Sequence, residues 1–216
     1  FHDAQQALET AISLFSAGHL SIDERAVAED LYWAICRRIA ELTKDAEYMP
    51  DELNELERLL CDTYFCNMSI FQSMPDSWAI NQIFPIMPIH RLDERPTQAA
   101  VLADVTCDSD GKIDRFIDRH GANRTLPLHP YDGSPYLLAA FLVGAYQEIL
   151  GDLHNLFGDT NAVHVNLTAD GNVELDSIIR GDTVTEVLDY VEFHRKDLVE
   201  RLQAAVEQAV RRGCLD

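Results

Sequence analysis

The hydrophobic pattern of this sequence changes its period near residue 63, and this change constrains the fold more than any other feature. Residues 4–17 place apolar side chains at helical spacing, and similar stripes continue towards residue 62. Beyond that point prolines separate short apolar runs and the helical period is lost. A helical pattern returns after Gly181. The sequence therefore predicts an α+β chain with a helical bundle over 1–62, a β region over 63–181 and helices over 182–216.

Three helices are predicted in the first segment. The first covers residues 4–17, and Ser21 with Glu24 forms a capping box that begins a second helix extending to about residue 42. Pro50 suits the first turn of a third helix. One face of this third helix carries three leucines: Leu53, Leu56 and Leu60.

The middle segment is predicted to form short strands joined by turns. The predicted strands cover residues 64–70, 99–105, 113–118, 136–143, 162–168 and 172–175. The last two form a hairpin turned by Asp170-Gly171. Several short strands with turn residues between them indicate an antiparallel β-sandwich or an open barrel.

Two helices are predicted near the carboxyl end. Thr183 with Glu186 repeats the capping-box pattern and begins the first of them. The last helix places Leu198, Leu202 and Val206 on one side and ends near Gly213, where a glycine favours termination.

The net charge of -20, from 37 acidic against 17 basic residues, argues against a nucleic-acid or anionic-lipid partner and suits a small cationic molecule. The longest apolar stretch, residues 136–146, is shorter than the roughly 20 residues of a membrane-spanning helix. The five cysteines include no C-x-x-C pair, and their odd number fits poorly with a complete set of disulfides. We therefore expect a reducing cytoplasm. The sequence begins at Phe1 without a start methionine or a leader, so we expect a fragment of a longer protein.

Two polar clusters are candidates for chemistry. Residues 106–111, Thr-Cys-Asp-Ser-Asp-Gly, follow a predicted strand directly; by itself such a run is typical of a turn or of a partial calcium loop. Residues 144–159 begin where an apolar strand is predicted to end and contain Tyr146 and His154. Without further information, Tyr146 is interpreted as a half-buried anchor and His154 as a structural or exposed residue.

The stretches 64–78, 106–111 and 143–159 resemble the biosynthetic arginine decarboxylases, and the similarity extends over nearly the whole chain. This resemblance implies an alanine-racemase-like enzyme that uses pyridoxal 5'-phosphate (PLP). In that family an amino-terminal β/α barrel holds the cofactor and a β domain follows, with a helical bundle inserted between them. Residues 1–62 resemble the inserted bundle, 63–181 the β-sandwich domain and 182–216 the start of a carboxyl-terminal helical domain.

No part of this sequence resembles the barrel of that family, and the positions of the three lysines are consistent with this. Lys44 and Lys196 lie in helical patterns and Lys112 lies beside a loop, so none has the surroundings expected of the lysine that forms the Schiff base with PLP. We expect the fragment to be inactive alone.

The resemblance implies roles for five residues. Cys107 matches a loop cysteine that enters the active site of the partner subunit and protonates the α-carbon after carbon dioxide leaves. Asp108 matches the acid that binds the cationic end of the substrate, with Asp110 as a weaker candidate for that task. Tyr146 matches a tyrosine that binds the cofactor phosphate within its own subunit, and His154 falls beside the substrate.

The expected reaction is decarboxylation of L-arginine to agmatine and CO2, in the biosynthesis of putrescine and spermidine. The resemblance also implies a homo-oligomer, a dimer or a dimer of dimers, with a shared active site, and Mg2+ as a second cofactor, although no ligand cluster for a metal stands out. The near alternatives are ornithine, diaminopimelate and carboxynorspermidine decarboxylases. A catalytically dead regulatory relative and an autonomous assembly module are the alternatives from other classes. The helical insertion and residues 107–111 favour arginine.

Overall fold

The computed structural model describes residues 1–43, 56, 58–119, 121–151 and 153–215. The fold is α+β, as predicted, with helices and small sheets. The chain divides into two compact units that alternate along the sequence. The first unit comprises Phe1–Tyr64, Met87–Val101 and Asp114–Leu138, and the second comprises Phe65–Ile86, Leu102–Ile113 and Ala139–Asp216. The domain boundaries expected near residues 62 and 181 remain predictions.

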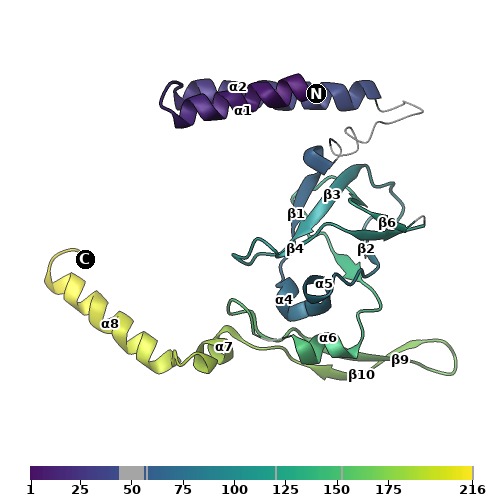
Figure 1. Cartoon of the computed structure of the whole chain (residues 1–216). Helices are drawn as coiled ribbons and strands as arrows, with labels where there is room; N and C mark the ends of the chain where they lie inside the picture. Colours follow the sequence, from purple (N-terminus) through teal and green to yellow (C-terminus); the bar gives the residue numbers. More distant parts are fainter. Residues whose placement is uncertain (44–55, 57, 120, 152, 216) are drawn as a thin grey trace. The chain divides into compact units, whose positions relative to one another are not determined.

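The first unit begins with two helices, α1 (His2–Ser16) and α2 (Ile22–Thr43), which run side by side in Figure 1. Gly18, at φ +77°, ends the first helix, because glycine adopts this left-handed conformation without strain. The predicted capping box is present: the Glu24 carboxylate accepts from the Ser21 nitrogen at 2.8 Å, and the Ser21 hydroxyl accepts from the Glu24 nitrogen at 3.3 Å.

The two helices share a small core of Tyr32, Cys36 and Leu56. Each of these three side chains is at least nine-tenths buried, and Leu8 and Trp33 pack against them. Of the predicted third helix, Leu56 and residues 58–60 are helical, whereas Pro50, Leu53 and also Lys44 lie outside the described residues.

Strands supply the rest of the first unit. Strand β3 (Gln98–Ala103) pairs antiparallel with β7 (Leu126–Leu128) and has β1 (Asp62–Phe65) as another neighbour, while β5 (Phe116–Asp118) pairs with β6 (Gly121–Asn123). The buried side chains of these strands in the first unit are Ala100, Phe116, Leu126 and Leu128.

The second unit combines short strands and short helices. Here β4 (Lys112–Ile113) pairs with the end of β3. The residues of β2 (Ile86–Pro88) and β8 (Leu138–Ala140), which pair with each other, are divided between the two units. Three helices lie against one another: α4 (Ile70–Ser73), α5 (Pro75–Ala79) and α6 (Ala145–Leu150). Their buried residues include Ile70 and Pro75. Figure 1 shows the loop between β3 and β4 projecting from the end of the sheet.

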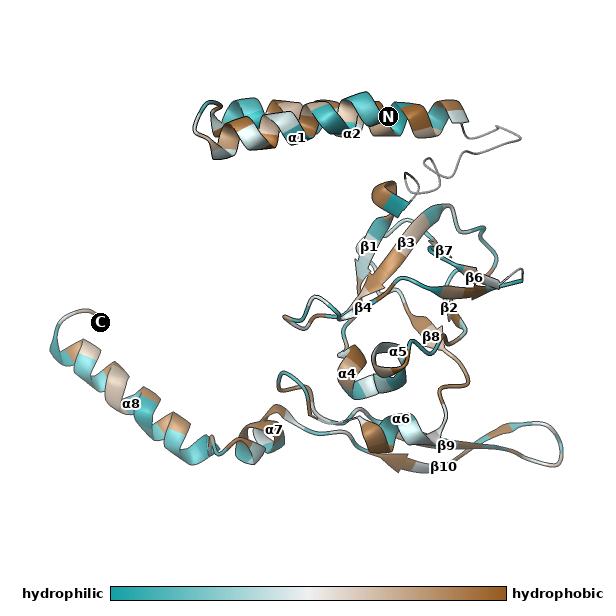
Figure 2. Cartoon of the chain, viewed as in Figure 1, coloured by the Kyte–Doolittle hydropathy of each residue, from teal (hydrophilic) through white to brown (hydrophobic). Residues whose placement is uncertain are grey.

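The predicted hairpin is confirmed as β9 (Ala162–Leu167) and β10 (Val173–Ile179), which pair antiparallel. A register shift between Leu175 and Ser177 adds one residue to β10. Opposing residues of a ladder share a face, so the hairpin presents apolar side chains on one side. In Figure 2 the hydrophobic positions of its ribbon are brown. These exposed residues are Val163, Val165, Leu167, Val173, Leu175 and Ile178.

The chain continues into α7 (Val184–Tyr190) and α8 (Arg195–Arg211). Both hydrogen bonds of the predicted Thr183–Glu186 capping box are present. Gly213, two residues beyond the end of α8, adopts a left-handed conformation, and the Cys214 nitrogen donates to the Ala209 carbonyl at 2.9 Å. Among the described residues, no helix has the length and apolar character needed to span a membrane.

Several predicted strands were too long. The strand expected over 64–70 ends at Phe65, because the Ser69 side chain caps α4. The strand expected over 113–118 is two strands, and that over 136–143 shortens to Leu138–Ala140, since Leu142 adopts φ +58° and leaves extended geometry. The prediction that Tyr146 lies at a strand end is wrong, because this residue belongs to helix α6. None of the sheets in the described ranges closes into a barrel.

Candidate active site

The loop between β3 and β4 is organised by the buried carboxylate of Asp104, which is only 3% exposed. One carboxylate oxygen accepts from the backbone nitrogen of Ile70 at 3.0 Å. The other accepts from the backbone nitrogen and the hydroxyl of Thr106, at 2.9 Å and 2.8 Å. The sequence analysis missed Asp104, although an aspartate just beyond a strand, with a threonine two residues later, is a recognisable turn pattern.

Gly111 closes this loop against the same carboxylate. The Asp104 nitrogen donates to the Gly111 carbonyl at 2.8 Å. A β-carbon at position 111 would collide with the Asp104 side chain, so the loop can close this tightly only around a glycine. Residues 105–110 are thus held as a compact loop with fixed ends.

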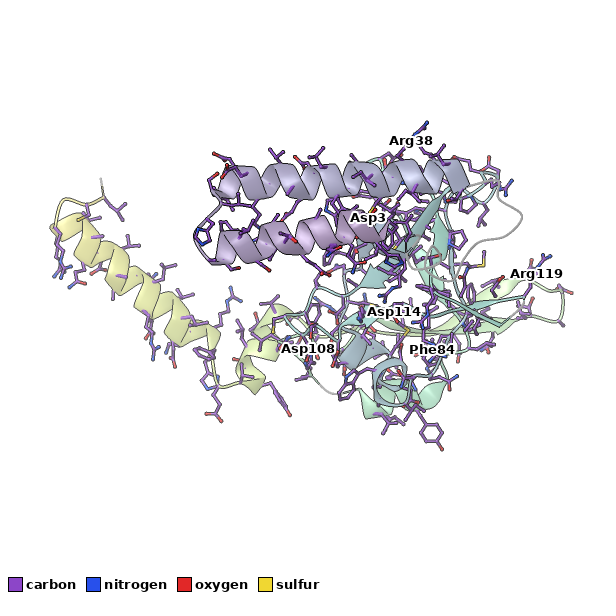
Figure 3. The ribbon with its side chains drawn as sticks, turned by 45° about the horizontal axis from the view of Figure 1, so that its top comes forward. Asp3, Arg38, Phe84, Asp108, Asp114 and Arg119 are labelled. Atoms are coloured by element: carbon purple, nitrogen blue, oxygen red, sulfur yellow. The ribbon has the colours of Figure 1, made fainter. Side chains whose placement is uncertain are left out.

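Cys107, Asp108 and Asp110 are all exposed on this loop. The Asp108 carboxylate accepts from the Asp110 nitrogen at 2.9 Å, and the Asp108 nitrogen donates to the Thr106 hydroxyl at 3.3 Å. Figure 3 labels Asp108, whose side chain leaves the loop between β3 and β4. The loop therefore presents a thiol and two carboxylates together.

A tight turn over residues 154–157 contributes the next part of the site. The Phe157 nitrogen donates to the His154 carbonyl at 3.0 Å, and the central residues Asn155 and Leu156 have φ +51° and +63°. Positive φ at both central positions is typical of a type I′ turn. The Asn155 side-chain nitrogen lies 3.4 Å from the Cys107 sulfur, so the turn reaches the Cys107 loop directly.

The ring of His154 is fixed by Ser69. The Ser69 oxygen lies 3.3 Å from Nδ1 of His154 and accepts from the Gln72 nitrogen, also at 3.3 Å. Ser69 is completely buried, so its hydroxyl hydrogen must find an acceptor inside the protein. Nδ1 of His154 is the acceptor within reach among the described residues, which assigns the ring hydrogen to Nε2.

An aromatic ring packs against this histidine. The Phe71 ring centroid lies 4.3 Å from that of His154, and Phe71 in turn contacts Trp78 at 5.2 Å in an edge-on arrangement. Contacts of this kind orient rings by their quadrupoles as well as by burial. His154 therefore combines a fixed tautomer with a fixed ring plane.

Tyr146 is presented by a helix that is held from its other side. The neighbouring residue Gln147 is 4% exposed, and its amide exchanges two hydrogen bonds with the backbone nitrogen and carboxylate of Asp76. Tyr146 is 74% exposed, and no described residue forms a hydrogen bond with its hydroxyl. The phenol is thus available to a ligand on a helix whose position is fixed.

Cys66 is a second thiol of this unit, and it is partly buried. Burial, aided by the negative charge of Asp104, raises the pKa of Cys66. The backbone N–H of Cys66 donates to the Ala103 carbonyl at 2.7 Å, so Cys66 lies beside the start of the Cys107 loop. No disulfide joins any of the five cysteines, all of which lie in the described part of the chain.

The first unit holds a separate cavity of about 460 Å3. None of the five predicted site residues lines it; its walls are His90, Arg91, Glu94, Pro130, Tyr131, Asp132, Ser134, Pro135 and Tyr136. The Arg91 guanidinium is engaged by the Glu94 carboxylate at 2.6 Å, and this hydrogen bond holds the pKa of Glu94 below its usual value. Over the described ranges, no cluster of His, Cys, Asp and Glu could hold a metal ion, so the Mg2+ expectation finds no ligand set there.

Comparisons with known proteins show which proteins this chain resembles. Residues 1–57 match the family model of the arginine decarboxylase helical bundle domain, and residues 184–216 match that of the arginine decarboxylase C-terminal helical extension. The biosynthetic arginine decarboxylase of Rhodopirellula baltica is 58% identical over 100% of this chain and 32% of its own length. That of Nostoc sp. is 54% identical over 97% of this chain and 31% of its own length.

Over nearly its whole length, the chain is therefore similar to one segment of the biosynthetic arginine decarboxylases. A solved structure agrees: the biosynthetic arginine decarboxylase SpeA from Campylobacter jejuni is similar with a TM-score of 0.72 and 34% identity, over 95% of this chain and 32% of that one. The chain thus spans about a third of the length of the arginine decarboxylases it matches. The match to the helical bundle covers the helices predicted at the start of the sequence.

Proposed function

We propose that this chain is part of a PLP-dependent enzyme that decarboxylates L-arginine to agmatine and CO2 in polyamine biosynthesis. The observation that carries the proposal is the 58% identity, over the whole chain, to a protein named biosynthetic arginine decarboxylase. Two family models with arginine decarboxylase in their descriptions support it. The exposed thiol and carboxylates of the Cys107 loop suit the chemistry that this reaction requires.

The cofactor fits the residues of this chain in part. When bound, PLP accepts the electron pair left on the α-carbon as carbon dioxide leaves. Tyr146 offers a hydroxyl, on the fixed helix α6, that can donate to the cofactor phosphate. Lys112 is exposed and Lys196 pairs with Glu200 at 3.8 Å, so neither described lysine suits a buried covalent attachment. The sequence around Lys44 has a helical pattern, and we therefore place the cofactor lysine outside this chain.

Cys107 is the proposed proton donor. In the step assigned to it, the S–H bond breaks with its electron pair kept by sulfur, and a C–H bond forms with the electron pair on the α-carbon. Sulfur then recovers a proton from water. A positioned acid contributes roughly 10²–10⁴-fold to such a step. The thiol is exposed on a loop whose ends are fixed, which suits insertion into a site built by another chain.

The cationic end of the substrate is assigned to Asp108. One of its carboxylate oxygens accepts from the Asp110 nitrogen, and a carboxylate can still accept the parallel hydrogen bonds of a guanidinium. Asp110 is the weaker candidate and supports the loop through this contact. His154, with its hydrogen on Nε2, presents a single donor towards the site and is assigned to substrate positioning.

The assembly is proposed to be a homo-oligomer, a dimer or a dimer of dimers, in which the Cys107 loop completes the active site of a partner subunit while Tyr146 serves its own. Five cysteines without a disulfide favour a reducing compartment, and we propose the cytoplasm. The charge of -20 favours a cationic substrate over nucleic acid.

The experiment is substrate profiling of the purified full-length protein loaded with PLP. Release of CO2 is measured from L-arginine, L-ornithine, diaminopimelate and carboxynorspermidine. We expect kcat/KM for arginine to exceed that for each other substrate by at least about 100-fold, because a site that binds a guanidinium leaves polar groups unpaired with a shorter substrate. A preference for another substrate would identify a related decarboxylase instead, and release from none would identify a regulatory relative.

A further inference from the structure

We propose that Asn155 is a positioning residue for the Cys107 thiol and stabilises the charge that appears on sulfur when the proton is delivered. This inference rests on the proposed function and extends it to a residue that the resemblance did not assign. It starts from the contact of 3.4 Å between the Asn155 side-chain nitrogen and the Cys107 sulfur, which joins residues 48 apart in the sequence.

The direction of this hydrogen bond suits a proton donor. The amide N–H donates and sulfur accepts, so the hydrogen of the thiol itself remains free to be given away. As the S–H bond breaks, negative charge develops on sulfur, and an N–H donor already directed at that atom stabilises it without rearrangement. A hydrogen bond to a charged group is worth more than one to a neutral group. The contact therefore strengthens during the step assigned to Cys107.

The backbone of the turn that carries Asn155 is strained. Asparagine tolerates the left-handed conformation, but Leu156 at φ +63° is a bulky residue in a region that L-residues rarely adopt. Such conformations persist where the surroundings impose them, and they gather at functional sites. Strain at Leu156 thus accompanies the side chain that reaches the thiol.

Both ends of the turn are anchored within the same unit. At its start His154 is held by buried Ser69 and by the Phe71 ring. At its end, a β-carbon on Gly158 would collide with the side chains of Asp182 and Val187, so this residue is packed tightly. The backbone that carries Asn155 is therefore held on both sides of the turn.

The turn also connects His154 and Cys107, the two residues proposed to position the substrate and to donate the proton. His154 and Asn155 are consecutive, yet one is fixed by Ser69 and the other contacts the Cys107 loop. Asp104, at the base of that loop, bonds to the first residue of α4, the helix that Ser69 caps. The substrate-side histidine and the proton donor are thus connected through one continuous set of hydrogen-bonded residues.

The test uses the full-length PLP-loaded protein with Asn155→Gly, which permits the left-handed backbone and deletes only the amide. We expect kcat for arginine to fall by about 10- to 100-fold, with KM and bound PLP within twofold, because a misplaced reacting group costs about this much. Asn155→Asp, which keeps the shape but cannot donate to sulfur, should lose as much. Asn172→Gly is the matched control in an exposed turn and should leave kcat unchanged.

A Cys107→Ala background separates positioning from simple structural damage. There, Asn155→Gly should have no further effect on the residual rate, because the two residues act through one contact. An equal loss in both backgrounds would overturn the inference, as would an unchanged kcat in the single variant. If Cys107→Ala alone leaves kcat unchanged, the assignment of Cys107 as proton donor fails, and the inference about Asn155 fails as well.

Alkylation of Cys107 supplies a readout that does not depend on activity. Mass spectrometry follows the rate at which iodoacetamide modifies the peptide containing Cys107 in the native protein. Without the donor that stabilises charge on sulfur, Asn155→Gly should react about 3- to 10-fold more slowly than the unchanged protein, a difference typical of one hydrogen bond. An equal or faster rate contradicts the contact. If arginine is not decarboxylated at all, the proposed function fails while this measurement still decides the contact.

Discussion

The carboxylate of Asp104 accepts a hydrogen bond from the backbone nitrogen of Ile70, 3.0 Å away and 34 residues earlier in the sequence. This bond joins the start of α4 to the base of the loop that carries Cys107. The same carboxylate also holds Thr106 from inside the loop. A single buried side chain therefore fixes the loop at its root, and the exposed thiol is presented on a rigid base.

Replacing Asp104 with asparagine should loosen this base. An amide has one oxygen where the carboxylate has two, so the bonds to Ile70 and Thr106 cannot both be kept, and the charge that strengthens them is lost. Losing a buried hydrogen bond of this kind costs roughly 1–3 kcal/mol. We expect amide hydrogen exchange in the peptide around Ile70 to become about 5- to 100-fold faster.

Asp118→Asn makes the same chemical change on an exposed strand residue and serves as the control. In the Asp118→Asn variant, amide hydrogen exchange around Ile70 should match that of the unchanged protein. Equal protection in both variants would show that the Asp104 carboxylate does not organise the loop.

The pH dependence of stability provides a test at Cys66. Because burial raises the pKa of this thiol, the folded protein keeps its proton to a higher pH than the unfolded chain does. The stabilisation is complete below the ordinary thiol pKa of about 8.5 and is lost as the pH rises through the raised value. The urea midpoint should therefore fall more between pH 8 and about pH 10 for the unchanged protein than for Cys66→Ser. Cys214→Ser, at an exposed cysteine, should follow the unchanged protein, and parallel pH profiles for all three would refute the assignment.

Local patterns in the sequence predicted the long elements well. The capping boxes at Ser21 and Thr183, and the hairpin turned near Gly171, depend on residues three or four positions apart, and the structure contains all of them. Helices α4, α5 and α6 have four to six residues, which is too short for a helical period to appear. Tyr146 was assigned to a strand end for this reason.

The organisation of the site could not be read in the same way. The contacts of Asp104 with Ile70 and of Asn155 with Cys107 join residues that are 34 and 48 positions apart, and their pairing depends on the folded chain. The resemblance placed Cys107, Asp108 and Asp110 on one polar loop, and the structure brings them together there. It carried no information about the residues that hold this loop in place.

Tyr146→Phe tests the proposed phosphate contact. Removing one hydrogen bond to a charged group weakens binding by roughly 1.5–3 kcal/mol, so the Kd of the full-length protein for PLP should rise about 10- to 150-fold. Turnover at saturating PLP should stay near its original value. Tyr190→Phe is a matched control, since both tyrosines are 74% exposed, and its Kd should not change. A Kd that is equally unaffected in Tyr146→Phe removes this residue from the cofactor site.

The central claim is that Cys107 donates the proton during decarboxylation of arginine, and steady-state turnover of the full-length Cys107→Ala protein tests it most directly. With PLP bound as tightly as before, kcat for CO2 release from L-arginine should fall by about 10²–10⁴-fold, the contribution of a positioned acid. Cys214→Ala, at another exposed cysteine, should retain full turnover. A kcat for Cys107→Ala equal to that of the unchanged protein would contradict the account.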